Sequence, residues 1–280
     1  MYSFITPRGT TLTYNRVGRG SPVLCVPGGP LLPVTYLGDL GGLSQHVELI
    51  LFNPPGSVPD EEADPSAYRC DNVVDDLEGL RRHLALDRVA LLGHSAGANI
   101  VLRYAERYPE HVDRLLLVAP STRAVGIDVS DAARSAVAQS REVEPWYPDA
   151  AAALARIQAG DARDDDWGAI APFSYGRWDQ VAVDYDAKMN AVRNPVAAAV
   201  FGSEGAFDPP ATRAALAALR VPVTVIAGAV DVGLPLSVMQ QLADVFPRAI
   251  LDAQAGAGHF PWVDDPSAFV TIAHTALIRQ

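Results

Sequence analysis

The sequence contains little cysteine and no long apolar run. Its 280 residues include two cysteines, Cys25 and Cys70, which are too few for a disulfide framework, and no CxxC or HxxxH spacing that could begin a metal site. No apolar run approaches the roughly 20 residues that span a bilayer. The opening stretch MYSFITPRGT lacks the basic start and apolar core of a secretory signal. We therefore expect a cytoplasmic protein that needs no metal or cofactor and has no membrane partner.

Basic residues are also scarce. Lysine and arginine total 22 against 33 acidic residues, which gives a formal net charge of -11. Partners with a phosphate backbone demand basic patches, so this charge argues against binding to nucleic acid. Hydrophobic residues make up 49% of the chain, which is enough for a substantial core. The expected partner is a small molecule or a short peptide.

Short apolar segments alternate with helical patterns along most of the chain. Apolar, β-branched runs of this kind suit strands that are covered on both faces. Amphipathic helical patterns follow at 72–86, 95–108 and 209–219. Strands that alternate with helices predict a mostly parallel central sheet flanked by helices, with the site beyond the carboxyl ends of the strands. The predicted strands are 22–28, 46–53, 87–93, 112–120 and 221–228, with 11–18 as an edge strand.

Residues 121–209 interrupt this alternation. The segment has no convincing strand but several alanine-rich helical stretches, with fourteen acidic and eight basic side chains. We interpret it as a helical lid inserted after the sixth strand, and residues 1–120 and 210–280 as the catalytic core. Because aromatic side chains in a mobile cover are typical of apolar recognition, we expect four of them to line the substrate site, with packing inside the lid as the alternative. They are Trp146, Tyr147, Trp178 and Phe201.

The stretch GHSAG, residues 93–97, places a serine between two glycines, after an apolar run and before a helical one. Glycine weakens both strands and helices, so some gain must compensate for its presence there. The pattern Gly-x-Ser-x-Gly between a strand and a helix is typical of a nucleophile elbow, a sharp turn that exposes the serine hydroxyl. We therefore predict that Ser95 is a nucleophile. The alternative is a tight turn with an incidental serine.

A nucleophilic serine needs a base, and the base needs an orienting carboxylate. Only His259 and His274 follow the elbow's helix and the next strand, and His274 lies in a terminal helical pattern, so His259 is the predicted base. Asp231 follows the strand 221–228, at the sheet edge where the site must form, and is the predicted acid. Its rivals are Asp208, Asp252 and the pair Asp264 and Asp265, which suit a helix N-terminus before Pro266.

Acyl transfer also requires backbone N–H donors for the oxyanion. The first donor is expected from Ala96, directly after Ser95. The second is expected in the loop PGGPLLP, where Gly29 carries an N–H and the neighbouring prolines have none. A plain Gly-Pro turn is the alternative for this loop. We interpret His94, beside the serine, as structural.

Together these motifs resemble the α/β-hydrolase superfamily and, within it, the proline iminopeptidase-like branch. The resemblance covers nearly the whole chain through PGGPL (27–31), GHSAG, RYPEHVDRLLLVAPS, SEGAFDP and GAGHFPWVDDP. It implies an α/β-hydrolase fold and a serine hydrolase. Two departures stand out: Pro27 replaces the first histidine of the branch's HGGPG, and NPPGSVPD (53–60) replaces its D-x-R-G-x-G-x-S stretch.

The resemblance also implies a place for a substrate ammonium group. An aminopeptidase must hold a free ammonium, which requires acidic side chains near the site. The segment SEGAFDP resembles the corresponding segment of the branch and indicates Glu204 as that acid. The alternative is a surface glutamate in a loop.

Three functional hypotheses remain. The first is a serine hydrolase that acts through an acyl-enzyme on a small amide or ester, such as the N-terminal residue of a peptide. The second is a biosynthetic tailoring enzyme that uses the same fold for a thioester, a lactone or a cyclisation. The third is a non-catalytic binding protein on the same scaffold, and the intact set of Ser95, Asp231 and His259 argues against it.

Overall fold

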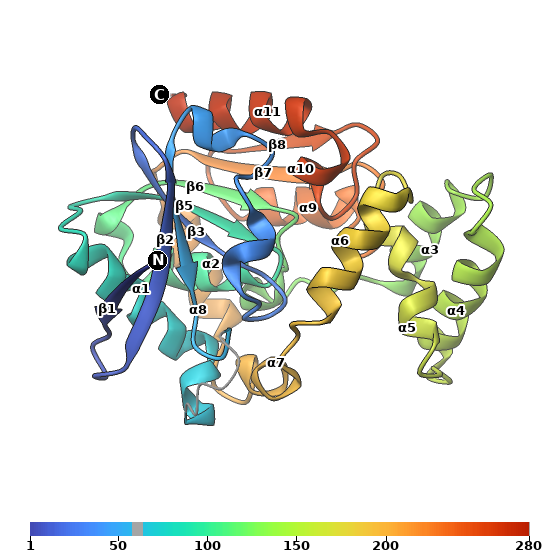
Figure 1. Ribbon diagram of the computed structural model, residues 1–280, viewed down its shortest axis with the longest axis horizontal. Coiled ribbons are helices and arrows are strands. Elements are labelled where there is room, and N and C mark those ends of the chain that lie inside the picture. Colours follow the sequence, from blue (N-terminus) through green and yellow to red (C-terminus); the bar gives the residue numbers. More distant parts are fainter. Residues whose placement is uncertain (58–63, 280) are drawn as a thin grey trace.

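A computed structural model of the protein describes residues 1–57 and 64–279. Within them, eight strands form one sheet in the order β1-β2-β4-β3-β5-β6-β7-β8 (Figure 1). β2 pairs antiparallel with β1 and β4, and every other neighbouring pair is parallel. The sheet is therefore mostly parallel, as predicted. The strands are β1 (Tyr2–Ile5), β2 (Thr11–Gly18), β3 (Pro22–Val26), β4 (Glu48–Asn53), β5 (Val89–His94), β6 (Val112–Val118), β7 (Val223–Gly228) and β8 (Ala249–Gln254).

The prediction that residues 11–18 form an edge strand is wrong in one respect. The segment is a strand, β2, but β1 pairs with its outer side and forms the edge of the sheet. Phe4 of β1 is buried, and its ring packs against those of Tyr14 and Phe52. Four residues are too short to give a clear periodicity, so β1 had no signal in the sequence strong enough to predict it.

Helices cover both faces of the sheet. Successive strand residues point to opposite sides, so that Leu24 and Ile50 lie in one apolar core while Val23 and Leu49 lie in the other. Residues of α1, α2, α8 and α9 complete the first core, and those of α11 complete the second. The helices are α1 (Cys70–His83), α2 (Gly97–Arg107), α3 (Asp131–Gln139), α4 (Tyr147–Ala159), α5 (Asp166–Ala169), α6 (Gln180–Asn190), α7 (Pro195–Phe201), α8 (Pro209–Ala218), α9 (Leu236–Ala243), α10 (Pro261–Asp264) and α11 (Pro266–Ile278).

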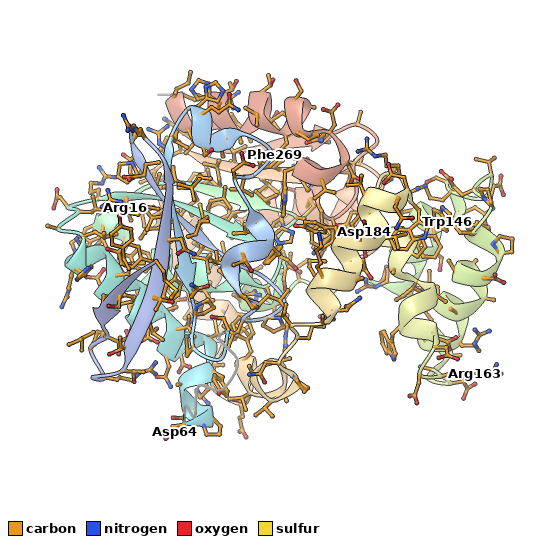
Figure 2. The ribbon with its side chains drawn as sticks, viewed as in Figure 1. Arg16, Asp64, Trp146, Arg163, Asp184 and Phe269 are labelled. Carbon is orange, nitrogen blue, oxygen red and sulfur yellow. The ribbon has the colours of Figure 1, made fainter. Side chains whose placement is uncertain are left out.

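The segment between β6 and α8, residues 121–208, is here called the helical insertion. α3, α4 and α5 stand to one side of the sheet, and α6 lies between them and the sheet (Figure 1). Trp146 and Arg163 belong to this outlying part, whereas Asp184 lies on α6 (Figure 2). Ala150, Leu154 and Phe173 contribute to a third, small apolar cluster within the insertion.

α8 returns the chain to the sheet. It packs on α2, where the Thr212 hydroxyl donates to Glu106 Oε2 at 2.6 Å. The side chain of Asp208 accepts a hydrogen bond from the Ala211 amide at 3.1 Å and so caps the first turn of α8. The helical insertion therefore ends at a well-defined helix start.

Neither a membrane span nor a metal cluster occurs in the described part of the chain. None of its helices is both long and apolar enough to cross a membrane. No group of three or more His, Cys, Asp or Glu side chains in residues 1–57 and 64–279 is placed to hold a metal ion. Cys25 and Cys70 are free and buried, and burial raises the pKa of both thiols. Each therefore acts as a small apolar side chain.

Candidate active site

Ser95 lies at the sharp turn between β5 and α2. Its φ of 51° is in the left-handed region, which a residue other than glycine adopts only when its surroundings impose it. Here the Ser95 N–H donates to the Val118 carbonyl at 3.0 Å, and the Ser95 carbonyl accepts from the Ala98 and Ser121 amides, each at 3.0 Å. These bonds hold the strained turn, and Ser95 lines the cavity beside it.

The two glycines of GHSAG allow this turn to pack. A Cβ on Gly93 would lie 2.8 Å from Ala98 Cα, and one on Gly97 would lie 2.4 Å from the Pro27 carbonyl oxygen. Both separations are shorter than real Cβ contacts, so any larger residue would push α2 away from the sheet. The two glycines therefore let the strand, the helix and the neighbouring loop pack closely. This packing compensates for the low strand and helix propensity of glycine.

The loop after β3 runs directly beside the serine. A Cβ on Gly28 would lie 2.8 Å from Ser95 Cβ. Gly29 has a φ of 114° and lines the same cavity as Ser95. Within the described residues, neither the Gly29 nor the Ala96 amide donates a hydrogen bond. Among the described residues neither amide has an acceptor, so both can donate to an oxygen atom of a substrate bound in the cavity.

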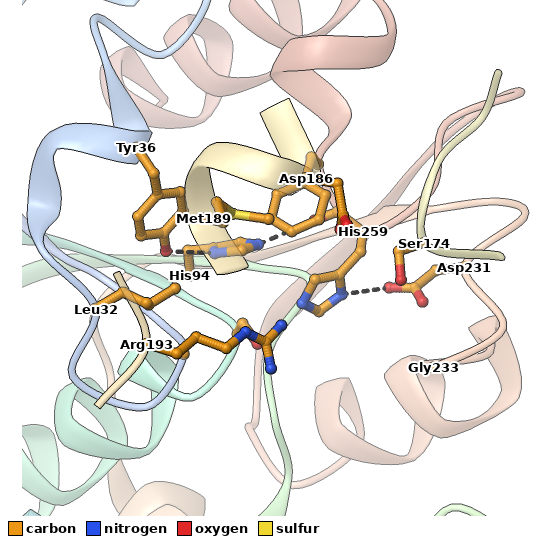
Figure 3. A pocket seen from close by; sticks show the side chains of 13 residues that line it. Leu32, Tyr36, His94, Ser174, Asp186, Met189, Arg193, Asp231, Gly233 and His259 are labelled. Atoms are coloured by element: carbon orange, nitrogen blue, oxygen red, sulfur yellow. Dashed lines mark hydrogen bonds and ion pairs between the residues drawn. The ribbon is translucent and has the colours of Figure 1, made fainter. Parts of the chain in front are cut away.

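The tertiary structure brings His259 and Asp231 together. Asp231 follows β7 and is 2% exposed, and its Oδ2 lies 2.7 Å from His259 Nδ1 (Figure 3). Its other oxygen, Oδ1, accepts from the Leu234 amide at 3.1 Å. The carboxylate therefore orients the ring by accepting from Nδ1–H, which leaves Nε2 as the proton acceptor. Ser95 and His259 line the same cavity.

Two of the rival acids prove to be helix caps. Asp208 caps α8, and Asp265 caps α11 by accepting from the Ala268 amide at 3.0 Å. Asp252 lies within β8. Only Asp231 among the predicted acids contacts the His259 ring in the described residues.

Asp264 differs from its predicted role as a helix N-terminal acid. It is buried at the end of α10, and its Oδ2 accepts from the Gly258 amide at 2.7 Å. The His259 amide next along the chain donates to the Ser174 carbonyl at 2.7 Å. Burial raises the pKa of Asp264, and the hydrogen bond from the Gly258 amide opposes that rise. Asp264 therefore holds the loop that carries the histidine, a role that sequence spacing does not reveal.

A chain of buried hydrogen bonds joins the loop after β3 to the His259 loop. The Gly28 amide donates to Tyr36 Oη at 2.6 Å, and Tyr36 Oη lies 2.7 Å from His94 Nδ1. His94 Nε2 lies 2.9 Å from the His259 carbonyl oxygen. Because that carbonyl can only accept, His94 carries its proton on Nε2, and Nδ1 accepts from the tyrosine hydroxyl. Burial, and then the field of His259, holds the pKa of His94 well below its usual value, so the ring is neutral.

His94 was expected to be structural, and its contacts agree with that role. The participation of Tyr36 had no signal in the sequence. Tyr36 lies in the short 3-10 helix η1 (Val34–Leu37), and the Asn53 side chain accepts from the Val34 amide at 3.1 Å. Asn53 is the first residue of NPPGSVPD, the departure from the resembled family, and residues 58–60 of that stretch lie outside the described residues.

The cavity beside Ser95 has a volume of about 230 Å³. One wall comes from the end of α6 and the residues around it, which supply Asp186, Met189 and Arg193. Figure 3 shows these side chains facing Tyr36, His94 and His259 across the cavity. Sequence patterns indicated none of the three.

The five predicted substrate contacts do not line this cavity. Trp146 stacks on the Arg141 guanidinium and packs edge-on against Phe173, which Tyr147 also contacts. Trp178 packs against Tyr175. Trp146 and Tyr147 therefore pack inside the helical insertion, as in the alternative interpretation, whereas Trp178 packs against the second apolar core. Phe201 is 1% exposed and belongs to the first apolar core.

Glu204 is the fifth of these residues. It is exposed in the loop between α7 and α8, and its carbonyl oxygen accepts from Arg69 Nη1 at 2.7 Å. The structure therefore does not bring Glu204 to the cavity. Other residues of SEGAFDP have structural roles, since Phe207 packs against Phe201 and Asp208 caps α8.

The chain is similar in sequence to several known proteins. A cis-3-alkyl-4-alkyloxetan-2-one decarboxylase of Shewanella oneidensis is 31% identical over 118 residues, which cover 41% of this chain and 37% of that protein. A proline iminopeptidase of Heyndrickxia coagulans is 30% identical over 121 residues, 42% of each chain. The chain thus aligns with less than half the length of these two relatives.

Similarity to solved structures extends much further along the chain. The crystal structure of a proline iminopeptidase from Mycobacterium smegmatis superposes with a TM-score of 0.73, covering 98% of this chain and 97% of that one at 20% sequence identity. At that identity the likeness is one of fold. The family model described as alpha/beta hydrolase fold matches residues 21–266, from before β3 to the start of α11. The chain therefore belongs to the α/β-hydrolase family.

Proposed function

We propose that the protein is a serine hydrolase that cleaves a small amide or ester through an acyl-enzyme. The observation that carries the proposal is the 2.7 Å contact between His259 Nδ1 and Asp231 Oδ2 beside a cavity that Ser95 also lines. A serine on a strained elbow, a base with a fixed tautomer and a buried carboxylate are the parts that nucleophilic acyl transfer needs.

In the proposed reaction, Ser95 Oγ attacks the substrate carbonyl while His259 Nε2 takes the hydroxyl proton. Asp231 stabilises the resulting imidazolium. The oxyanion of the tetrahedral intermediate accepts hydrogen bonds from the Gly29 and Ala96 amides. His259 then returns the proton to the departing amine or alcohol, leaving an acyl group on Ser95. A water molecule, deprotonated by the same ring, attacks the acyl-enzyme; the bond to Ser95 Oγ breaks, the ring returns the proton to Oγ, and the acid leaves.

The helical insertion supports a further part of the proposal, that residues 121–209 act as a lid over a core formed by 1–120 and 210–280. Asp186, Met189 and Arg193 at the end of α6 already form a wall of the cavity. Arg134 of α3 donates to the Gly233 carbonyl at 2.8 Å, which ties the insertion to the loop that carries Asp231. A lid joined in this way limits the size of the substrate that fits the cavity, and it supplies none of the catalytic residues.

The proline iminopeptidase-like branch supports an N-terminal amide as one substrate class, because one of the relatives carries that name. The second hypothesis, a tailoring enzyme for a lactone or related group, is favoured by the relative named as an oxetanone decarboxylase. Both use the same proposed nucleophile, so the substrate decides between them.

Labelling and a substrate panel test the proposal. A fluorophosphonate should modify the wild-type protein at Ser95 and leave the Ser95→Ala variant unlabelled, as judged by intact mass. Turnover should then be measured on aminoacyl amides, 4-nitrophenyl esters, acyl thioesters and β-lactones. A folded wild-type protein that neither reacts with the fluorophosphonate nor turns over any of these would overturn the serine hydrolase proposal and favour a binding protein.

A further inference from the structure

Arg193 lies where two cavities meet. It follows α6 and lines the 230 Å³ cavity that contains Ser95 and His259. Figure 3 shows its guanidinium turned into that cavity, on the side of His259. A second cavity, of about 360 Å³, is also lined by Arg193, together with Asp186 and Ser174 from the first. The cavities therefore share these three residues.

The combined volume of the two cavities matches that of a typical small-molecule site. The cavity at Ser95 alone is smaller than the roughly 300–1,000 Å³ of most small-molecule sites, whereas the two together fall within that range. The second compartment is bounded by Trp167, which is 61% exposed, and by Ile170 and Ala171. A substrate held at Ser95 can therefore extend past Arg193 towards an apolar surface.

The Arg193 side chain makes no hydrogen bond or ion pair with another residue in the described ranges. Other arginines of the helical insertion hold its framework: Arg134 and Arg141 donate to backbone carbonyls, and Arg156 pairs with an aspartate. The hydrogen bond that Arg193 makes to a described residue comes from its backbone amide, to the Asn190 carbonyl at 3.5 Å. A guanidinium that faces a cavity in this way is suited to bind a ligand rather than to hold the fold.

Asp186, an acid that lines both cavities together with Arg193, is engaged elsewhere. It accepts from the Tyr175 hydroxyl at 3.3 Å and from Asn190 Nδ2 at 2.7 Å. Burial raises the pKa of Asp186, and Arg193 opposes that rise through its field rather than through a hydrogen bond. The negative charge of Asp186 also disfavours a phosphate dianion at the junction, so a monoanion is the better match for Arg193.

We propose that Arg193 binds a carboxylate of the substrate, remote from the scissile carbonyl, at the junction of the two cavities. The planar guanidinium matches a carboxylate through two parallel hydrogen bonds. The proposal rests on the serine hydrolase function proposed above and names its substrate class as carboxylate-bearing amides or esters.

Two matched pairs of esters test the proposal. In the first pair the carboxylate is on the leaving group: 4-acetoxybenzoate against methyl 4-acetoxybenzoate. In the second pair it is on the acyl group: mono-4-nitrophenyl adipate against methyl 4-nitrophenyl adipate. The measured quantity is the ratio of kcat/KM for the acid to that for its methyl ester. Because each ratio compares two esters with one protein, a general loss of activity cancels.

The expected result is a ratio of about 10 for at least one pair in the wild type, falling to near 1 in Arg193→Gln and partly recovered in Arg193→Lys. The pair that responds identifies the side of the substrate that carries the carboxylate. Arg163→Gln is the matched control: Arg163 is exposed, as Arg193 is, but it lies outside both cavities, so the variant removes the same charge and should keep the wild-type ratio.

Equal ratios in the wild type and Arg193→Gln for both pairs would overturn the proposal. A wild-type preference for 4-nitrophenyl 6-aminohexanoate that Asp186→Asn removes would overturn it too, because the junction would then bind a cation. Should none of these esters be hydrolysed, fluorophosphonate labelling and the wider substrate panel decide the serine hydrolase proposal separately. Calorimetry with adipate then tests the carboxylate site without catalysis, and equal binding by wild type and Arg193→Gln would refute it.

Discussion

The turn at Ser95 and the outlying part of the helical insertion, α3 to α5, differ in how tightly their glycines are packed. Around Ser95, a Cβ added to Gly28, Gly93 or Gly97 would lie within 2.9 Å of a neighbouring atom. In the outlying part of the helical insertion, a Cβ added to Gly160 or Gly168 would meet no atom within 4 Å, whereas Gly176, which lies against Gly256, has no room for one. Reacting groups must be held to fractions of an ångström, whereas a surface that selects substrates tolerates change. The difference supports the proposal that the core carries out the reaction and that the insertion selects the substrate.

The largest expected effect is removal of the base from the core. His259→Ala should lower kcat to the level of Ser95→Ala, leaving about 10³ to 10⁴ over the uncatalysed reaction, because the oxyanion donors and binding groups remain. The double variant should lose no more activity than either single one. Steady-state kinetics on the best substrate of the panel measures this, with the melting temperature as the control for folding. Losses that multiply in the double variant would contradict a shared catalytic unit.

A matched pair of glycine substitutions tests the packing difference directly. Gly97→Ala puts a methyl group 2.4 Å from the Pro27 carbonyl oxygen and should lower the free energy of unfolding by about 1–3 kcal/mol, with a loss of kcat. Gly168→Ala, inside α5, meets no atom and should raise it by about 0.5–1 kcal/mol, because alanine favours helix. Urea denaturation measures both. Similar changes in the two variants would mean that the regions are packed alike.

A pair of tyrosine substitutions sharpens the comparison of hydrogen bonds. Tyr36→Phe removes the hydroxyl between Gly28 N–H and His94 Nδ1 and leaves two buried groups unpaired, which costs about 1–3 kcal/mol of stability. Since the same bonds place the loop that carries Gly29, kcat should fall about tenfold or more with little change in KM. Tyr147→Phe removes an exposed bond to Gln139 and should change the free energy of unfolding by less than about 0.5 kcal/mol. Loss of stability without loss of kcat in Tyr36→Phe would limit Tyr36 to a structural role.

The smallest expected effect is at Glu204. Because its side chain is exposed and does not line the cavity, Glu204→Gln should change kcat/KM by less than about twofold on both free-amine and N-acylated substrates. Kinetics on an aminoacyl amide and its N-acetyl derivative measures this. A selective loss on the free amine would restore the ammonium-binding role predicted from SEGAFDP.

Much of the fold could be predicted because its signals are local. The helices predicted at 72–86, 95–108 and 209–219 are α1, α2 and α8, and the five apolar runs are parallel strands. Strand β1 was missed because it is short, and β2 was misplaced at the edge for the same reason. The aromatic residues of the insertion were expected at the cavity, but Trp146 and Tyr147 pack on Phe173 instead. An apolar ring gives the same pattern in a sequence whether it covers a ligand or a neighbouring helix.

The elbow could be predicted from the local sequence alone, because the glycines that permit the turn lie close to the serine that it exposes. Asp231 was selected by its place after a strand, since parallel strands deliver their carboxyl ends to one edge, and His259 by elimination of the other histidines; the two side chains lie 2.7 Å apart. Tyr36, Asp264 and Arg193 could not be found in that way. Tyr36 bonds to His94 across 58 positions, and Arg193 meets Ser95 and His259 only at the wall of a folded cavity. Contacts between distant parts of the chain depend on how its elements pack, and no local pattern of residues encodes them.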